Sequence, residues 1–60
     1  MNIRLKKARE KCGLSQAEVA KKAEITERGY QRYEAGERVP NVLIAKRIAC
    51  ILNCTVDDLF

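Results

Sequence analysis

Residues 14–36, LSQAEVAKKAEITERGYQRYEAG, decide the fold of this 60-residue chain. The stretch contains two short helical patterns, one over residues 16–23 and one over residues 27–34. Ser15 opens the first pattern with a glutamate three residues later, which is the signature of a capping box. Thr26 is the capping candidate of the second. Only three residues, EIT, join the two patterns, and so short a connection with an apolar residue in it makes two helices cross steeply.

Helical spacing continues on both sides of this stretch. A first helix is predicted over residues 3 to about 12, because apolar residues recur there every three to four positions, and Gly13 ends it. Another is predicted over residues 42 to about 52 with Asn41 as its cap, and a last short turn starts at Thr55. No segment alternates with the period of a strand. We therefore predict an all-α fold of five short helices around one core.

Length and composition place the chain among small globular domains. It is 47% hydrophobic and 33% charged, with three glycines and one proline, which argues against disorder and low complexity. No stretch approaches the roughly 18 apolar residues of a membrane span. The first residues show no secretory signal. We expect a single domain over residues 1–60, with little room for a deep catalytic cleft.

Charge favours a polyanionic partner, most often nucleic acid. Lysine and arginine exceed aspartate and glutamate by 12 to 8, so the net charge is +4. The chain has no histidine, so the usual general base is missing, and no glycine-rich phosphate loop is present. We therefore expect no enzyme.

The three cysteines, Cys12, Cys50 and Cys54, indicate a reducing cytosol rather than a disulfide framework, because their number is odd and no signal peptide precedes them. Zinc sites use four ligands, which three cysteines without histidine do not supply. We expect these side chains to act as small apolar groups, and we predict neither a metal nor a cofactor.

The order of motifs resembles the Cro/phage-repressor (XRE-type) helix-turn-helix family from about Ile3 to Phe60. The resemblance rests on the initial L-S-Q, the packing positions Ala20 and Ile25, the Y-E-x-G exit, the proline after the loop and the final D-D-L-F. It implies a lambda-repressor-like domain that binds double-stranded DNA in the cytoplasm of a prokaryotic or phage-like context. Such proteins regulate transcription, more often as repressors. A weak homodimer on a pseudo-palindromic operator, with no membrane partner, is expected.

The resemblance implies that the second helix of the motif enters the major groove. The expected base contacts are Glu27, Arg28, Gln31 and Arg32. Arginine suits guanine and glutamine suits adenine, whereas a carboxylate near phosphates is repelled unless it accepts from cytosine. The alternative is a solvated charged face on which Glu27 pairs with the arginines.

Phosphate contacts are expected from three residues outside that helix, namely Gln16, Arg38 and Asn41. Gln16 starts a helix, where amide groups can meet a phosphate, although it could equally be an exposed polar helix starter. The family commonly has a partly buried ion pair at the positions of Arg9 and Glu34, which implies a structural role for these two residues.

The helix over residues 42–52 carries more apolar residues than one core-facing stripe needs. The predicted stripe consists of Val42, Ala45, Ile48, Ala49 and Leu52. Leu43, Ile44 and Ile51 fall outside or at its edges, so they are candidates for a dimer interface. The alternative is a wide core face with scattered exposed apolar residues.

Two residues depart from the family pattern. Glu24 stands in the turn where relatives often carry glycine, and it must then accept a less comfortable backbone. Gly29 lies inside the predicted recognition helix and costs about 0.8–1 kcal/mol relative to alanine.

A different class of function, an antitoxin-like or scaffold module that binds another protein, would not need the Arg28–Arg32 face.

Overall fold

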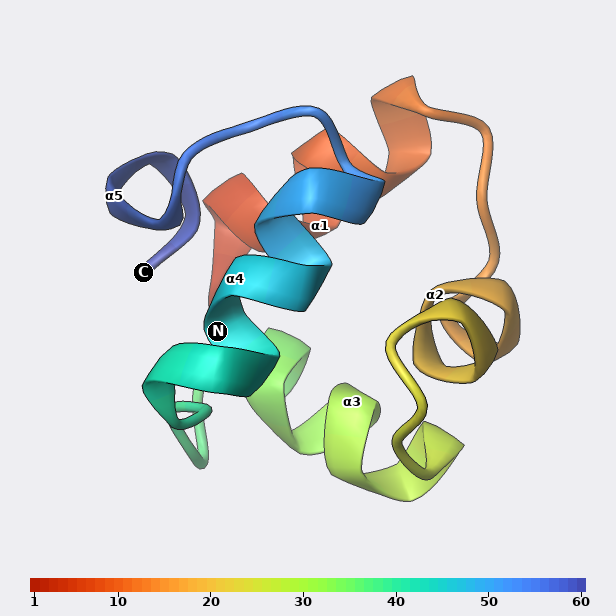
Figure 1. Ribbon diagram of the computed structural model, residues 1–60, viewed down its shortest axis with the longest axis vertical. Helices are drawn as coiled ribbons and strands as arrows, with labels where there is room; N and C mark the ends of the chain where they lie inside the picture. The colour runs from red at the N-terminus through yellow and green to blue at the C-terminus, as the bar shows by residue number, and fades with distance from the viewer.

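The computed structural model describes all residues from 1 to 60 and confirms the all-α prediction. Five helices follow one another without a strand: α1 (Ile3–Lys11), α2 (Gln16–Lys22), α3 (Glu27–Ala35), α4 (Val42–Ile51) and α5 (Val56–Leu59). Helices α2 and α3 pack against each other, and α1 lies against both α3 and α5 (Figure 1). The molecule measures 21 Å along each principal axis.

Each helix begins at a residue whose side-chain oxygen accepts a hydrogen bond from a backbone amide of the first turn. Ser15 forms the predicted capping box, because Glu18 also accepts from the Ser15 amide at 2.9 Å. Thr26 and Asn41 cap α3 and α4 as predicted. Asn2 caps α1 and was not foreseen from the sequence. These caps fix where the helices start. They also stabilise segments that are too short to be stable helices on their own.

Four helices end in the same way, with one residue in the left-handed conformation. That residue is Gly13 after α1, Glu24 after α2, Gly36 after α3 and Asn53 after α4. After α2, the amides of Glu24 and Ile25 donate to the carbonyls of Lys21 and Ala20 at 3.2 and 3.0 Å, which is a Schellman arrangement. Glu24 adopts φ 60°, the uncomfortable backbone expected of it.

All five helices contribute side chains to one core. Nine buried residues form it: Leu5, Val19, Ala20, Ala23, Tyr30, Ile48, Ala49, Leu52 and Leu59. Because the core draws on every helix, the position of α3 depends on the whole domain rather than on its own nine residues.

Helix α4 corrects part of the sequence prediction. Val42, expected in the core stripe, is 71% exposed, because it occupies the first turn of α4, where no other helix covers it. Ile44 and Ile51, which were predicted to lie outside the core stripe or at its edges, are partly buried and pack against the core, as the alternative of a wide core face expected. The core face of α4 is therefore wider than one stripe. Leu43, at 59% exposed, stays free of the core.

Candidate nucleic-acid interface

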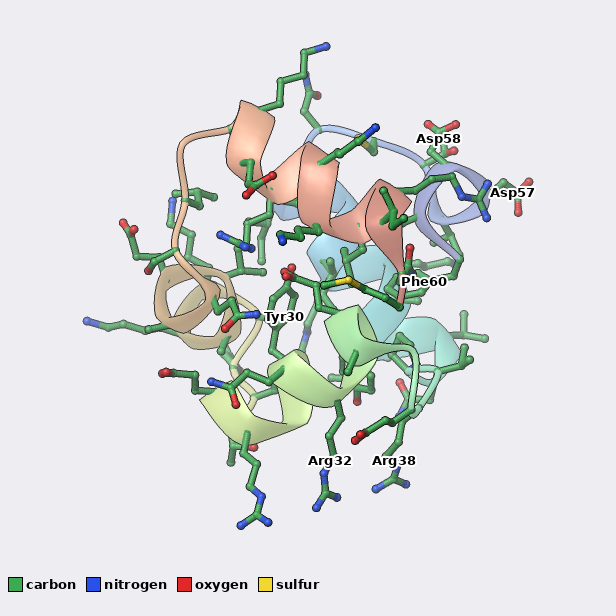
Figure 2. The ribbon with its side chains drawn as sticks, turned by 180° about the vertical axis from the view of Figure 1, so that it is seen from behind. Tyr30, Arg32, Arg38, Asp57, Asp58 and Phe60 are labelled. Carbon is green, nitrogen blue, oxygen red and sulfur yellow. The ribbon has the colours of Figure 1, made fainter.

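Helix α3 separates polar side chains that face solvent from side chains that hold it to the core. Arg28, Gln31 and Arg32 are exposed, as is Glu27, whereas Tyr30 is fully buried. Figure 2 shows Tyr30 pointing into the molecule while Arg32 and Arg38 extend away from it on one side. All four predicted base-contacting residues are therefore accessible to a partner.

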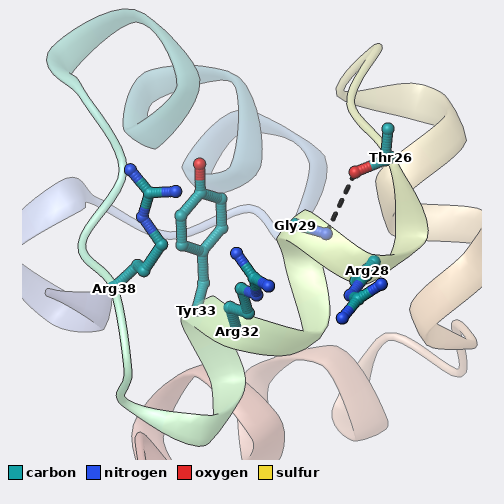
Figure 3. A pocket seen from close by; sticks show the side chains of 6 residues that line it. All are labelled: Thr26, Arg28, Gly29, Arg32, Tyr33 and Arg38. Atoms are coloured by element: carbon teal, nitrogen blue, oxygen red, sulfur yellow. Dashed lines mark hydrogen bonds between the residues drawn. The ribbon is translucent and has the colours of Figure 1, made fainter.

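Three arginines border one hollow on this surface. Arg28 and Arg32 come from α3 and Arg38 from the loop that follows, while Thr26, Gly29 and Tyr33 complete the lining (Figure 3). No carboxylate lines the hollow, and none of the three guanidinium groups has an acidic partner within 4.0 Å. The hollow is therefore a concentrated, unneutralised positive site.

A second hollow lies on the other flank of the same arginines. Its lining consists of Arg28, Gln31, Arg32, Ala35 and Glu37. Arg28 and Arg32 consequently stand between two depressions and can reach a ligand that covers either of them. Glu37 adds a negative charge at the edge of this second hollow only.

The Glu34 carboxylate ties α3 to the elements before it. Arg9 donates to it through Nε at 2.6 Å and through Nη2 at 3.2 Å, and Gln16 donates to it through Nε2 at 3.1 Å. The remaining Arg9 nitrogen, Nη1, donates to the carbonyl of Leu14 at 2.8 Å. One partly buried network therefore joins α1, the loop after it, the start of α2 and the end of α3.

Electrostatics within this network keep Glu34 ionised. Burial alone would raise the pKa of Glu34, but the hydrogen bonds it accepts, led by that from Arg9, outweigh burial and lower the pKa below its usual range. The same contact raises the pKa of Arg9. Burial, and then the nearby Glu34 carboxylate, raise the pKa of the Tyr30 hydroxyl. This hydroxyl lies beside Glu34 but makes no hydrogen bond of acceptable geometry.

The predicted phosphate-contacting residues do not form one group. Arg38 joins the α3 arginines in their hollow, which Gln16 and Asn41 do not line. The side-chain Nε2 of Gln16 already donates to Glu34, and the side-chain Oδ1 of Asn41 accepts from the Ile44 amide at 2.9 Å as the cap of α4. The side-chain oxygen of Gln16 and the side-chain nitrogen of Asn41 are not used in these bonds and can contact another partner.

Sequence reasoning did not assign Thr26 and Tyr33 to this surface. Thr26 was identified only as a helix cap, a role that the structure confirms. Tyr33 is half-buried: it packs against the core and also lines the arginine hollow. The sequence did contain a signal for placing Thr26 on this surface. As the N-cap of α3, Thr26 lies at the same end of the helix as Arg28, which is in its first turn.

A steep helix pair that presents a polar, arginine-rich second helix defines a helix-turn-helix domain. The helix-turn-helix family matches residues 5–59, and the chain belongs to this family. The chain is also similar over all its 60 residues to an uncharacterized HTH-type transcriptional regulator from Archaeoglobus fulgidus, at 33% identity and over 86% of that protein. No solved structure matches the chain. DNA-binding transcriptional regulation is the class of function that these similarities support. None of the five helices has the length and apolar character needed to cross a membrane.

Proposed function

We propose that this protein is a sequence-specific regulator that binds double-stranded DNA by placing α3 in the major groove. The observation that carries the proposal is the hollow bordered by Arg28, Arg32 and Arg38, which have no acidic partners. Unpaired arginines on an accessible helix suit a polyanion whose groove admits an α-helix. Residues 1–60 act as one domain in this proposal, and no catalysis is part of it.

Arg28 and Arg32 lie about one turn of the α-helix apart, and they read bases about two base pairs apart. Four residues advance an α-helix by about 6 Å, which is close to the spacing of two base pairs at about 3.4 Å each. Each guanidinium group can donate two hydrogen bonds to a guanine, and Gln31 can pair with an adenine. Glu27 contacts DNA only where it accepts from a cytosine.

Phosphate contacts set the register of α3 in the groove. Arg38 reaches a phosphate beside the groove, while Asn41 and Gln16 contribute through the parts of their amide groups that the fold leaves unused. These contacts strengthen binding to any sequence, since a phosphate carries no base identity.

The protein acts as a repressor in the form of a weak homodimer on a pseudo-palindromic operator. Support for the dimer comes from exposed apolar residues that lie within five positions of the sequence, Val39, Val42 and Leu43. Of the three interface candidates, Leu43 makes no core contact and is free to contact a second subunit. Ile44 and Ile51 pack partly against the core, so only the exposed parts of their side chains can contact a second subunit. A second unit doubles the number of base pairs that are read.

The test is selection of bound duplexes from a random library, followed by competition titrations against scrambled duplex. We expect Arg32→Ala to weaken the selected site by about 1–3 kcal/mol and to relax one base position. Arg38→Ala should weaken all sequences similarly and reduce the slope of log affinity against log salt by about one.

Arg4→Ala is the matched control, because Arg4 is an exposed arginine near Asp58 of α5 rather than at the α3 hollow. It should change neither base preference nor affinity beyond a small general loss. If the wild-type protein prefers no selected duplex over scrambled DNA, the proposal is wrong, and a protein-binding role becomes the better explanation of the exposed apolar residues.

A further inference from the structure

Two cysteines that are 42 positions apart approach the same oxygen atom. The thiol of Cys12, at the end of α1, lies 3.5 Å from the carbonyl oxygen of Leu52, and the thiol of Cys54 lies 3.3 Å from the same oxygen. The ends of α1 and α4 are neighbours in the fold (Figure 1). Both thiols therefore lie within hydrogen-bonding distance of one carbonyl oxygen.

The turn after α4 creates this convergence. Asn53 adopts the left-handed φ of 56°, and the amide of Cys54 donates back to the carbonyl of Ala49 at 2.9 Å. The chain therefore reverses at Asn53 and returns the Cys54 thiol to the Leu52 carbonyl. Sequence spacing could not show this, because Cys54 is four residues from Cys50 but shares its acceptor oxygen with Cys12.

The two thiols also line one hollow, on a part of the surface separate from the α3 arginines. Its lining consists of Ala8, Lys11, Cys12, Leu52, Asn53 and Cys54. Cys12 is exposed and Cys54 is partly buried, so a small ion has access to both sulfurs. Cys50 does not line the hollow.

We propose that the thiolates of Cys12 and Cys54 together bind one soft monovalent metal ion of the Cu(I) type. Thiolates favour soft ions, and Cu(I) accepts two or three ligands, whereas a zinc site is completed by four. Binding displaces one proton from each thiol and leaves a complex with a net charge of −1. The ammonium group of Lys11 in the wall of the hollow offsets that charge. This site does not depend on the proposed binding of DNA.

The experiment titrates the full-length protein, under anaerobic conditions and with a thiol-free reductant, against Cu(I) held by a coloured chelator. We expect the wild-type protein to remove one Cu(I) per chain from the chelator. Cys12→Ser and Cys54→Ala should each weaken the site about 100-fold or more, because each removes one of two thiolates. Cys50→Ser is the matched control and should retain the wild-type affinity.

Circular dichroism checks that the variants are folded. Cys12 is exposed, so Cys12→Ser decides the question even if replacing the partly buried Cys54 disturbs the fold. Retention of affinity by Cys12→Ser, or an equal loss in Cys50→Ser, would overturn the assignment. It would also fail if the wild-type protein took no Cu(I), or took one ion per two chains in sedimentation, since an ion shared between chains is not held by this pair.

Discussion

Removing the guanidinium group of Arg9 tests how much the fold depends on the network at Glu34. Arg9→Met keeps most of the side-chain volume and deletes the two hydrogen bonds to the carboxylate, at 2.6 and 3.2 Å, together with the one to Leu14. The side chain of Glu34 is only 3% exposed, so Gln16 would be left as the main donor to a buried charge.

The expected cost is large relative to the stability of so small a domain. Breaking one side of a buried ion pair costs about 3–5 kcal/mol, since the stranded charge has lost its partner. A 60-residue domain has roughly 3–9 kcal/mol of total stability. At about 4–8 °C per kcal/mol, Arg9→Met should lower Tm by at least about 12 °C. Glu34→Leu should cost less, because the Arg9 side chain is 13% exposed and keeps Leu14 as an acceptor.

Thermal and urea unfolding of the wild type, both single variants and Arg9→Met/Glu34→Leu complete a double-mutant cycle. An apolar pair of similar size in place of a buried ion pair is often neutral or stabilising, so we expect the double variant within about 1 kcal/mol of the wild type. The reasoning is refuted if Arg9→Met costs less than about 1 kcal/mol, or if the double variant loses the sum of the two single losses.

Four further outcomes are expected from the same unfolding assays and from titrations with DNA duplexes. Tyr30→Phe should leave stability unchanged or raise it by about 1 kcal/mol, because the buried hydroxyl makes no well-formed hydrogen bond; a loss above about 1 kcal/mol would contradict this. Glu24→Gly should raise stability by up to about 1 kcal/mol by relieving the positive φ, since the Glu24–Arg47 contact at 4.0 Å is long and exposed; a clear loss would mean that this contact matters. The pKa of Glu34 is lower in the folded chain than its ordinary 4.5. The stability that ionised Glu34 contributes to folding is therefore fully present above pH 4.5 and is lost as the pH falls below it. Urea midpoints measured from pH 7 to pH 2 should decline below about pH 4.5, and they should decline less steeply in Glu34→Gln. Leu43→Glu should keep the fold and Tm, because Leu43 is exposed, and should reduce affinity for a two-half-site duplex but not for one half-site; equal affinities would place the dimer elsewhere.

Local signals in the sequence predicted the helices well. The capping patterns at Ser15, Thr26 and Asn41 involve residues three apart, so the information is complete within one turn. The left-handed residue Glu24 was also predictable, although only from the family pattern, because glutamate itself has no preference for that conformation. Asn2 was missed, although an asparagine directly before a helical pattern is a common cap.

Burial on α4 was harder to predict, because it depends on which helices cover each turn. Val42 and Ala45 share the stripe of the helical pattern, but only Ala45 lies where other elements cover it. Ile44 and Ile51 pack against the core because the core covers more than one stripe of α4. Periodicity gives the angle of a side chain around its helix, not the extent of the neighbouring surface.

The site shows the same division between local and tertiary information. The α3 face was predictable, since residues at i and i+4 share one side of a helix. The position of Arg38 beside Arg28 and Arg32 follows from the path of the loop after Gly36, which no sequence period encodes. Cys12 and Cys54 reach the same carbonyl oxygen for a similar reason, through the turn at Asn53.

Stability alone does not explain why an ion pair, Arg9–Glu34, joins α1 to α3. An apolar pair in the same place can stabilise the contact between two helices equally well. An apolar contact resists separation but tolerates small rotations, whereas the Arg9–Glu34 pair, with a further donor from Gln16, fixes both the rotation and the axial position of α3. Arg28 and Arg32 extend from the exposed part of the same helix, so a small rotation of α3 about Glu34 displaces both guanidinium groups. The Arg9→Met/Glu34→Leu variant should therefore bind scrambled duplex as the wild type does but discriminate less well in favour of the selected site. An unchanged ratio between the two affinities, in a variant as stable as the wild type, would show that the core alone holds α3 in place for recognition.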